Sequence, residues 1–382
     1  MHSRQECRML RRRRVEMEIR KLTQEEKVLT KPLYEEAFPE DTPPLVEYYY
    51  SRKMADNEVW AAMDSGRAVG MLCLNPYRVM VRGQEYPLSY IVAVATAKTH
   101  RRRGIMRQLL TAALRSQCAA GLPFTFLKPA NVAYYTPFGF AFASEREHRR
   151  LKRESGMTAA GGGAEIVPFA EDAAAAAMQF MNRYLAERFE VYCYRDALYM
   201  ERLLAEVEAA GGHAELLCDR EKGKIAGIRI WDYQDVPEEN CRLLAEERFT
   251  EPAIDKKSGE ALNNTPFLMA RILSLPAFLE RISLRKEAAQ EACVRYFRFR
   301  DELLPENNGL WRWSLNREES HIEAVQEVPG SPESEAMDAP NAVPEFTPAR
   351  MARWLLGGEA CSAAAWCGDI RPYRGVYFDE ET

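Results

Sequence analysis

The sequence lacks the apolar runs and metal-binding patterns that mark several protein classes. None of its hydrophobic stretches approaches the ~18 consecutive apolar residues that a transmembrane helix needs, so we expect no membrane association. There are only five histidines, and the nine cysteines include no CxxC pair, so we expect no metal site. Dispersed, unpaired cysteines are typical of a reducing environment, which predicts a cytoplasmic protein.

The chain also lacks an excess of positive charge. The net charge of −5 and the isoelectric point near 5.8 do not favour a nucleic-acid partner. The exception is the N-terminus, where six arginines occur between Arg4 and Arg14. No apolar stretch follows them, so they do not form a secretory signal. We predict that residues 1–16 are a disordered leader, with a nucleic-acid-binding arm as the alternative.

The remaining chain has the composition of a folded protein. With 47% hydrophobic and 29% charged residues over a length of 382, it can form two or three domains. Up to about residue 150, the pattern predicts a mixed α/β sandwich around a partly antiparallel sheet. Its expected elements are a strand at 17–22, hairpins turning at 64–66 and 82–84, a helix at 104–119 and a strand at 122–127.

Two further segments follow a glycine-rich break at 161–163. The first resembles a second, smaller α/β unit, and the last, beginning near Leu268, is again mixed. Their expected helices lie at 173–187, 195–210, 277–284 and 348–356, and their expected strands at 213–218, 224–231, 294–300 and 310–315.

The most informative stretch is VATAKTHRRRGIMR, residues 94–107, where an apolar strand runs into a basic turn and then a helix. The free N–H groups and the dipole of a helix N-terminus attract an anion. Gly104 allows the backbone to approach a phosphate closely, and neighbouring arginines can add charge-assisted hydrogen bonds. A solvated basic turn has the same composition, so this stretch is not decisive alone.

A second stretch, NVAYYTPFGF at residues 131–140, follows at a suitable distance. An arginine followed three residues later by glycine resembles the pyrophosphate-binding motif of the GNAT acetyltransferases, and Tyr-x-x-Phe-Gly-Phe is similar to their tyrosine-bearing segment. Together the two stretches resemble the enhanced-intracellular-survival (Eis) family. MARILSLPAFL at 269–279 and the segment 346–358 resemble two parts of that family's C-terminal domain.

The resemblance implies a fold and a division of the chain. The expected class is α/β (α+β), with a GNAT fold repeated twice and followed by a sterol-carrier-like α+β domain. The catalytic GNAT domain would span 17–150, and a second GNAT-like domain without a cofactor site would span 151–266. The sterol-carrier-like domain would span 267–382.

The resemblance also implies the site residues for acetyl-coenzyme A. The backbone of the strand end would pair with the pantetheine arm, and the turn and helix start would hold the pyrophosphate. Two residues after the next strand match positions close to the cofactor. The cofactor-binding residues would be Val94, Ala95, Thr96, Arg102, Arg103, Gly104, Ile105, Met106, Arg107, Ala130 and Asn131.

Two catalytic residues follow from the same resemblance. Tyr135 would be the general acid for the departing thiolate, with Tyr134 the neighbour most easily confused with it. In the family the base is the chain's own C-terminal carboxylate, which here belongs to Thr382. The tail ends in acidic residues rather than an aromatic one, so the side chains of residues 379–381 are alternative bases.

The implied function is direct transfer of an acetyl group to a primary amine of a small cationic acceptor, similar to an aminoglycoside or a polyamine. One alternative is a GNAT enzyme acting on protein or peptide amines. Another is a lipid-binding protein whose pocket is lined by the tryptophans at 311, 313, 354 and 366. The family also implies a homo-oligomer, with a hexamer as the expected form.

Overall fold

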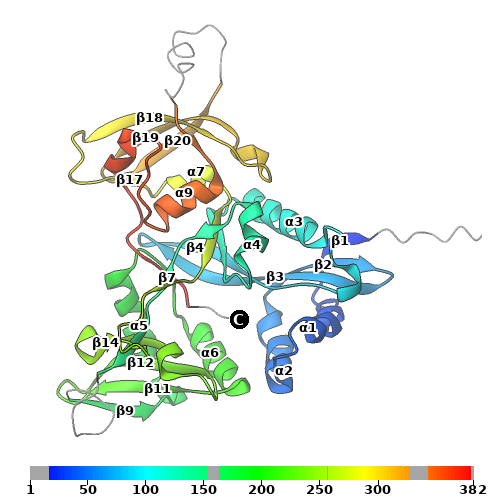
Figure 1. Ribbon diagram of the computed structural model, residues 1–382, viewed down its shortest axis with the longest axis vertical. Coiled ribbons are helices and arrows are strands. Elements are labelled where there is room, and N and C mark those ends of the chain that lie inside the picture. Colours follow the sequence, from blue (N-terminus) through cyan, green and yellow to red (C-terminus); the bar gives the residue numbers. More distant parts are fainter. Residues whose placement is uncertain (1–16, 153–162, 256, 327–342, 380–382) are drawn as a thin grey trace, which may run out of the picture.

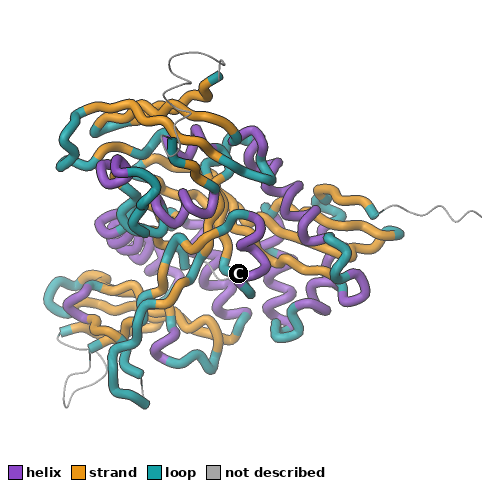
Figure 2. The backbone as a smooth tube through the Cα atoms, turned by 45° about the horizontal axis from the view of Figure 1, so that its top comes forward, coloured by secondary structure: helices purple, strands orange, loops and turns teal. Residues whose placement is uncertain are grey.

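The computed structural model describes residues 17–152, 163–255, 257–326 and 343–379. The predicted leader, 1–16, lies outside the described residues, and so do Glu380, Glu381 and Thr382. The described chain forms three bodies, each built around its own sheet (Figures 1 and 2). Among these residues, no helix is both long and apolar enough to cross a membrane.

The central body is a mixed sheet with helices on both faces. One face is covered by α1 (Lys31–Ala37) and α2 (Pro43–Ser51), and the other by α3 (Ile105–Ala119). Residues 69–75 of β3 are buried without interruption, so both faces of the sheet are covered there. The strand order is β1 (Glu18–Lys21), β2 (Glu58–Asp64), β3 (Arg67–Val81), β4 (Gln84–Thr96), β5 (Phe124–Leu127), β16 (Met269–Ile272) and β6 (Ala141–Phe142).

The second body follows residue 163, and its antiparallel sheet has α5 (Ala174–Arg188) and α6 (Ala197–Ala209) packed against one face. Its strand order is β13 (Arg242–Ala245), β12 (Lys224–Tyr233), β11 (Gly211–Asp219) and β9 (Ala164–Pro168).

The third body pairs a four-stranded sheet with α7 (Leu275–Leu279) and α9 (Pro348–Leu355). Its order is β20 (Ser320–Val325), β19 (Gly309–Asn316), β18 (Ala292–Phe299) and β21 (Glu345–Phe346). The helix predicted at 277–284 is shorter than expected, because Ser274 caps it earlier and residues 283–284 form β17.

Three short strand pairs lie outside the main sheets: β8 (Arg149–Leu151) with β14 (Thr250–Pro252), β7 (Glu145–Arg146) with β15 (Thr265–Pro266), and β17 (Ser283–Leu284) with β22 (Ile370–Arg371).

One strand crosses from the third segment into the central sheet. β16 lies between β5 and β6, and Met269 is paired with both Leu127 and Phe142. All four of its residues are buried, including Arg271, which is 1% exposed. An apolar run of this kind needs a position inside a sheet. The central sheet is therefore completed by a strand from beyond residue 266.

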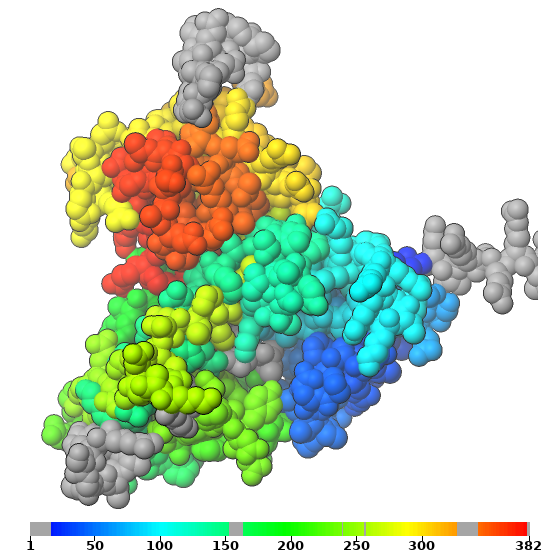
Figure 3. All heavy atoms as spheres, in the orientation of Figure 1, coloured from blue at the N-terminus to red at the C-terminus, as the bar shows by residue number. Residues whose placement is uncertain are grey.

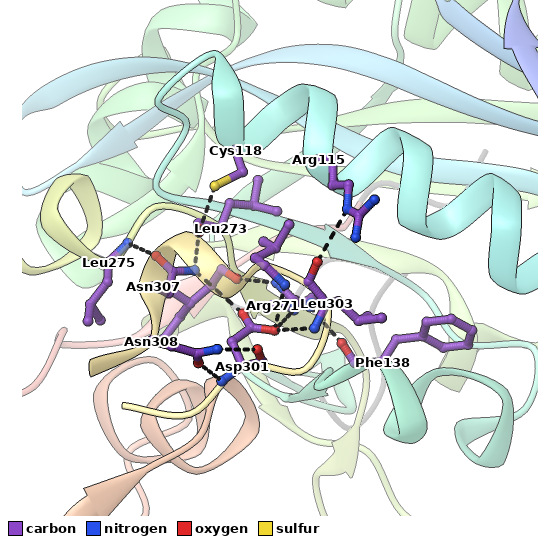
Figure 4. A network of polar contacts seen from close by, with 12 residues as sticks. Arg115, Cys118, Phe138, Arg271, Leu273, Leu275, Asp301, Leu303, Asn307 and Asn308 are labelled. Atoms are coloured by element: carbon purple, nitrogen blue, oxygen red, sulfur yellow. Dashed lines mark hydrogen bonds and ion pairs between the residues drawn. The ribbon is translucent and has the colours of Figure 1, made fainter. Parts of the chain in front are cut away.

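Arg271 joins this strand to the third body through a buried network (Figure 4). Its guanidinium donates to the carbonyl of Phe138 and to Oδ1 of Asp301, each at 2.6 Å. Asp301 also accepts from two backbone N–H groups, and Asn307 donates to the carbonyl of Leu273 at 2.7 Å. The network holds the turn after α4 (Val132–Tyr135) against the third body.

We predict that Arg271→Met lowers the free energy of unfolding by about 3–5 kcal/mol, because it leaves the buried Asp301 carboxylate without a cation. Urea denaturation measures the loss, and the double variant with Asp301→Leu should recover part of it. The control is Arg353→Met, whose ion pair with Glu359 is exposed and should contribute below about 1 kcal/mol. An equal effect of the two single variants would contradict the prediction.

Candidate functional site

The site begins where two strands of the central sheet separate. β4 and β5 share a single register pair, Tyr90 with Phe126. Beyond it, β4 bulges: Ala93 has φ +52°, and the pairing with β3 shifts between Met71 and Cys73. A bulge bends its strand and turns it away from a neighbour. The rest of β4 therefore leaves β5 and stays paired with β3.

The predicted pantetheine-binding residues lie on this diverging end. Ala95 pairs with Met71 of β3 and Thr96 with Gly70, while neither is paired with β5. Val94 and Thr96 are partly exposed. In the described structure, the edge of β4 that faces β5 is thus not paired with a strand at these residues. An extended ligand with amide groups can pair with such an edge.

The basic turn after β4 leads directly to the N-terminus of α3. Gly104 precedes the first helical residue with φ +75°, and Arg102 has φ +63°. Both conformations are left-handed, which glycine adopts without strain. A Cβ atom at Gly104 would meet nothing within 4 Å, so the space in front of the helix is open. Ile105 is buried and Met106 packs against the core, which anchors the turn.

Arg107 connects this helix to the tyrosine segment. Its guanidinium lies 5.2 Å from the centre of the Phe138 ring. α4 begins at a cap in which Asn131 Oδ1 accepts from the N–H of Ala133 at 2.9 Å. Asn131 thus has a structural role, while Ala130 beside it is exposed. The two sequence motifs are adjacent in the fold.

The two tyrosines of α4 differ in environment. Tyr134 is 56% exposed, whereas Tyr135 is 6% exposed and packs against Phe140. Burial raises the pKa of Tyr135 to about 12. Within the described part of the chain, its hydroxyl forms no hydrogen bond. Tyr135 is therefore a neutral phenol whose proton is held tightly.

The end of the chain reaches the same place from the third body. β23 (Val376–Tyr377) runs parallel to β10 (Val191–Cys193), which is paired antiparallel with β3. Phe378 then stacks on Phe126, with ring centres 4.0 Å apart and an angle of 8°. The tail thus lies against the residue pair at which β4 and β5 separate.

Asp379 is held in a buried ion pair. Its carboxylate accepts from Arg195, which is fully buried, and its backbone carbonyl accepts from Arg242 at 3.3 Å. Burial alone would raise the pKa of Asp379, but Arg195 and Arg242 outweigh it, and the pKa lies below its ordinary value. Asp379 is therefore an anchor for the tail.

A cavity of about 240 Å³ opens beside this tail, on the sheet face that carries α1 and α2. Figure 3 shows the blue segment of α2 and the green segment of α6 meeting on this side, and the hydroxyl of Tyr48 donates to the carbonyl of Arg202 at 2.9 Å. The ring of Tyr77, on the cavity wall, lies 6.4 Å from Tyr90 and 6.5 Å from Phe126. The cavity is lined by residues within 53–57, 75–78 and 194–206, with Pro87 and Arg242.

Comparison with known proteins identifies this arrangement. Residues 18–143 match the acetyltransferase (GNAT) domain family. These residues form an acetyltransferase domain of the GNAT type. No curated protein matches the sequence. In the described part of the chain, no group of three or more His, Cys, Asp or Glu side chains could hold a metal ion.

Solved structures of similar fold cover nearly the whole chain. A probable N-acyltransferase from Enterococcus faecalis shares 14% identity at a TM-score of 0.69, over 93% of each chain. A GCN5-related N-acetyltransferase from Anabaena variabilis shares 14% identity at a TM-score of 0.67, over 93% of this chain and 94% of that chain. Eis1 from Mycobacterium abscessus shares 15% identity at a TM-score of 0.61, over 93% of each chain. At these identities the likeness concerns the fold.

The structure places the predicted residues on the end of β4, the turn and start of α3, and the cap and end of α4, and Arg107 contacts the segment that follows Tyr135. Thr382 lies outside the described residues. Sequence reasoning missed the bulge at Ala93, the anchoring arginines Arg195 and Arg242, and the cavity between the first two bodies. A buried arginine has no local sequence signal that separates it from an exposed one. Its partner here, Asp379, is 184 residues away.

We predict that Asp379→Asn lowers the free energy of unfolding by up to about 3–5 kcal/mol at neutral pH, because the buried Arg195 loses its ion pair with this carboxylate. The folded pKa of Asp379 is depressed, so its stabilisation is complete above the unfolded value near 4 and is lost as the pH falls through the folded value. The gap between variant and parent should therefore shrink below about pH 4. Denaturation curves at several pH values test this, with Glu359→Gln as the exposed control; a gap independent of pH would contradict it.

Proposed function

We propose that the chain transfers the acetyl group of acetyl-coenzyme A directly to a primary amine of a small acceptor. The observation that carries this proposal is the continuous path from the unpaired edge of β4 to the open N-terminus of α3. A strand edge suits the amides of the pantetheine arm, and a helix N-terminus with arginines suits a pyrophosphate. Val94 to Thr96 and residues 102–107 would hold these two parts, with Ala130 and Asn131 close by.

The acceptor must attack as a neutral amine, and deprotonating an alkylamine at pH 7 costs ~4–5 kcal/mol. Its nitrogen adds to the thioester carbon, and a backbone N–H of β4 can stabilise the developing oxyanion. The nitrogen then loses a proton to a base, and the carbon–sulfur bond breaks. The products are the N-acetylated amine and the coenzyme thiol.

Tyr135 would stabilise the departing thiolate. With a pKa of about 12, it is a weaker acid than a thiol near 8.5, so complete proton transfer is uphill by about 5 kcal/mol. A hydrogen bond from the phenol to the sulfur needs no such transfer and strengthens as charge builds. We therefore assign Tyr135 primarily as a hydrogen-bond donor to the sulfur. It would act as a full proton donor only if the bound cofactor brought the pKa values of the phenol and the thiol closer together.

The base would be supplied by the tail beyond Asp379. Asp379 itself is engaged by Arg195 and has a lowered pKa, which argues against it. The terminal carboxylate of Thr382 is our first assignment, with the side chains of Glu380 and Glu381 as alternatives. The stack of Phe378 on Phe126 supports this, because it fixes the start of the tail beside the slot.

A small acceptor is favoured over a protein. The cavity lies between two bodies rather than on an open face, and its 240 Å³ suit a small molecule or a single side chain. Aminoglycoside- and polyamine-like amines are the class that the resemblance implies. A screen of acetyl transfer from acetyl-coenzyme A to amines and peptides tests this; transfer to peptides alone would refute it.

The lipid-binding alternative is less well supported. Trp311, Trp313 and Trp354 are each 6% exposed or less. They form a core with Trp366 and Phe346, in which Phe346 stacks on Trp354 at 5.5 Å. These rings fill space that a lipid would need.

We also propose that the three bodies correspond to a catalytic GNAT domain, a second GNAT-like domain without a cofactor site, and a sterol-carrier-like domain. The helix-covered antiparallel sheet of the second body supports the middle assignment. A homo-oligomer, with a hexamer as the family expectation, is testable by analytical ultracentrifugation.

We predict that Gly104→Asp weakens acetyl-coenzyme A binding at least tenfold, because it places a negative charge in front of the helix where the phosphates would lie. Gly104→Asn is the matched control, since asparagine has the same shape and also tolerates the left-handed conformation. Calorimetry gives both affinities. Equal affinities for the two variants would exclude this pyrophosphate site.

We predict that Tyr135→Phe lowers kcat roughly 10- to 1,000-fold and changes cofactor affinity little, because the hydroxyl acts as charge builds on sulfur. Tyr134→Phe is the control and should leave kcat within a factor of about two, since a solvent-exposed side chain contributes little to the buried site. Steady-state kinetics decide; a larger effect at Tyr134 would place the donor one residue earlier.

We predict that the tail completes the site. Removing residues 380–382 and, separately, adding a few residues after Thr382 should both lower kcat while cofactor affinity stays constant. An effect of the deletion alone would assign the base to a side chain of the tail. Full activity of both variants would place the base elsewhere.

A further inference from the structure

The charged side chains that line the cavity between α2 and α6 all have partners of opposite charge. The ion pairs are those of Asp56 with Arg202, Asp196 with Arg78, Glu206 with Lys53, and Arg242 with Asp232. Among the described residues, the wall therefore provides no excess charge of either sign. An acceptor bound here would have to be selected by contacts other than an ion pair.

Asn57 is a polar side chain of this wall that is buried without a partner. The residue is 3% exposed, and in the described structure neither Nδ2 nor Oδ1 of its amide has a hydrogen-bond partner. A buried amide in this state is unfavourable, and a ligand that pairs with both atoms would remove the penalty. Because Asn57 lines the cavity, it offers a polar contact to a bound acceptor.

The strand register places Asn57 in line with the point where β4 leaves β5. Glu58 of β2 is paired with Leu74 of β3, so Asn57 lies beside Asn75, which also lines the cavity. Asn75 is paired with Tyr90, the residue of β4 that is paired with β5. Side chains directly opposite one another lie on the same face of a sheet, and neighbouring strands are about 4.8 Å apart. Asn57 is therefore two strands, or roughly 10 Å, from this point, on the face that holds the cavity.

The two atoms of the Asn57 amide define the chemistry of the group that would bind there. A carboxylate only accepts hydrogen bonds and an ammonium group only donates them, so either would leave one of the two atoms without a partner. A carboxamide donates and accepts in one plane, so it can pair with Nδ2 and Oδ1 together. It carries no charge, which agrees with a wall whose charges are already paired.

We propose that Asn57 determines acceptor specificity by binding a carboxamide group of the acceptor amine. This inference rests on the proposed function, because it concerns the acceptor of that reaction. The carboxamide would pair with Asn57, and an alkyl chain would run past Asn75 along the ring of Tyr77. The amine would then lie near Tyr90, where the thioester is proposed to bind. A chain of about four methylene groups suits the distance of two strands, since the hydrogen bonds to Asn57 occupy part of it.

The first test compares four acceptors of similar length that differ at one end. 5-Aminopentanamide carries the carboxamide, 5-methylhexylamine an apolar group of the same shape, 5-aminopentanoate a carboxylate, and cadaverine a second ammonium group. We expect kcat/KM for acetyl transfer by the full-length protein to be at least fivefold higher for 5-aminopentanamide than for each of the others. A smaller difference from any of the three would overturn the inference.

The second test changes the asparagine. Asn57→Leu keeps the size of the side chain but removes both hydrogen-bonding atoms, so the ratio of kcat/KM for 5-aminopentanamide to that for 5-methylhexylamine should fall at least fivefold. Acetyl-coenzyme A affinity and the free energy of unfolding should be retained, because a buried amide without partners does not stabilise the fold. Asn264→Leu, at an exposed position, is the control and should leave the ratio unchanged.

Asn57→Asp provides a further variant that keeps the shape of the side chain. Its carboxylate accepts hydrogen bonds but donates none, so the ratio of kcat/KM for 5-aminopentanamide to that for cadaverine should fall at least fivefold. An unchanged ratio in either Asn57 variant would overturn the role of this residue.

Failure of the proposed function would give a different result, since none of the four amines would then be acetylated. Calorimetric titration of the full-length protein with 5-aminopentanamide and with 5-methylhexylamine decides the inference in that case. Binding of 5-aminopentanamide at least fivefold more tightly, with the difference lost in Asn57→Leu, would support it. A smaller difference, a difference that persists in Asn57→Leu, or no binding of 5-aminopentanamide would overturn it.

Discussion

The separation of β4 from β5 at the pair Tyr90 and Phe126 is the constraint on which the rest of the site depends. An uninterrupted ladder would pair the end of β4 with β5 and leave no edge for a ligand. The same phenylalanine receives the tail, because Phe378 stacks on it. Phe126 thus lies where β4 leaves β5, in contact with the tail and near Tyr77 of the cavity wall.

Because β4 is not paired with β5 beyond Tyr90, other contacts must stabilise its end. β4 stays paired with β3 on both sides of the bulge, and Ala97 donates to the carbonyl of Val69 at 3.0 Å just beyond the strand. The next N–H, of Lys98, donates to the carboxylate of Glu36 on α1 at 2.8 Å. These contacts stabilise the end of β4 along its edge toward β3 and on the sheet face that carries α1. The edge toward β5 can therefore stay unpaired while the strand remains ordered.

Local features of the site were predictable from sequence, and distant ones were not. The turn before Gly104 and the tyrosines of α4 lie in short motifs whose conformations depend on neighbouring residues, so their patterns predict them. The position of β16 in the central sheet could not be predicted from sequence, because an apolar run does not indicate which sheet the strand joins. The anchor of Asp379 on Arg195 is likewise a contact between residues far apart in sequence. The high pKa of Tyr135 follows from burial, which only the tertiary structure determines.

The position of the tail is fixed upstream as well as at Asp379. Glu190 accepts from Arg82 of the central sheet at 2.9 Å and from the N–H of Arg374 at 2.9 Å, and it also pairs with Arg371. These residues come from all three bodies, and the pair of Arg82 and Glu190 is only 11% exposed. The tail strand is therefore held at both ends by contacts that exist only when the three bodies are assembled. A fragment ending near residue 150 would keep the free edge of β4 and the N-terminus of α3, which are the proposed donor site, but would lose β16, the α6 wall and the tail. If the proposed function is right, donor binding and acetyl transfer have different structural requirements in this chain, and only the second depends on all three bodies.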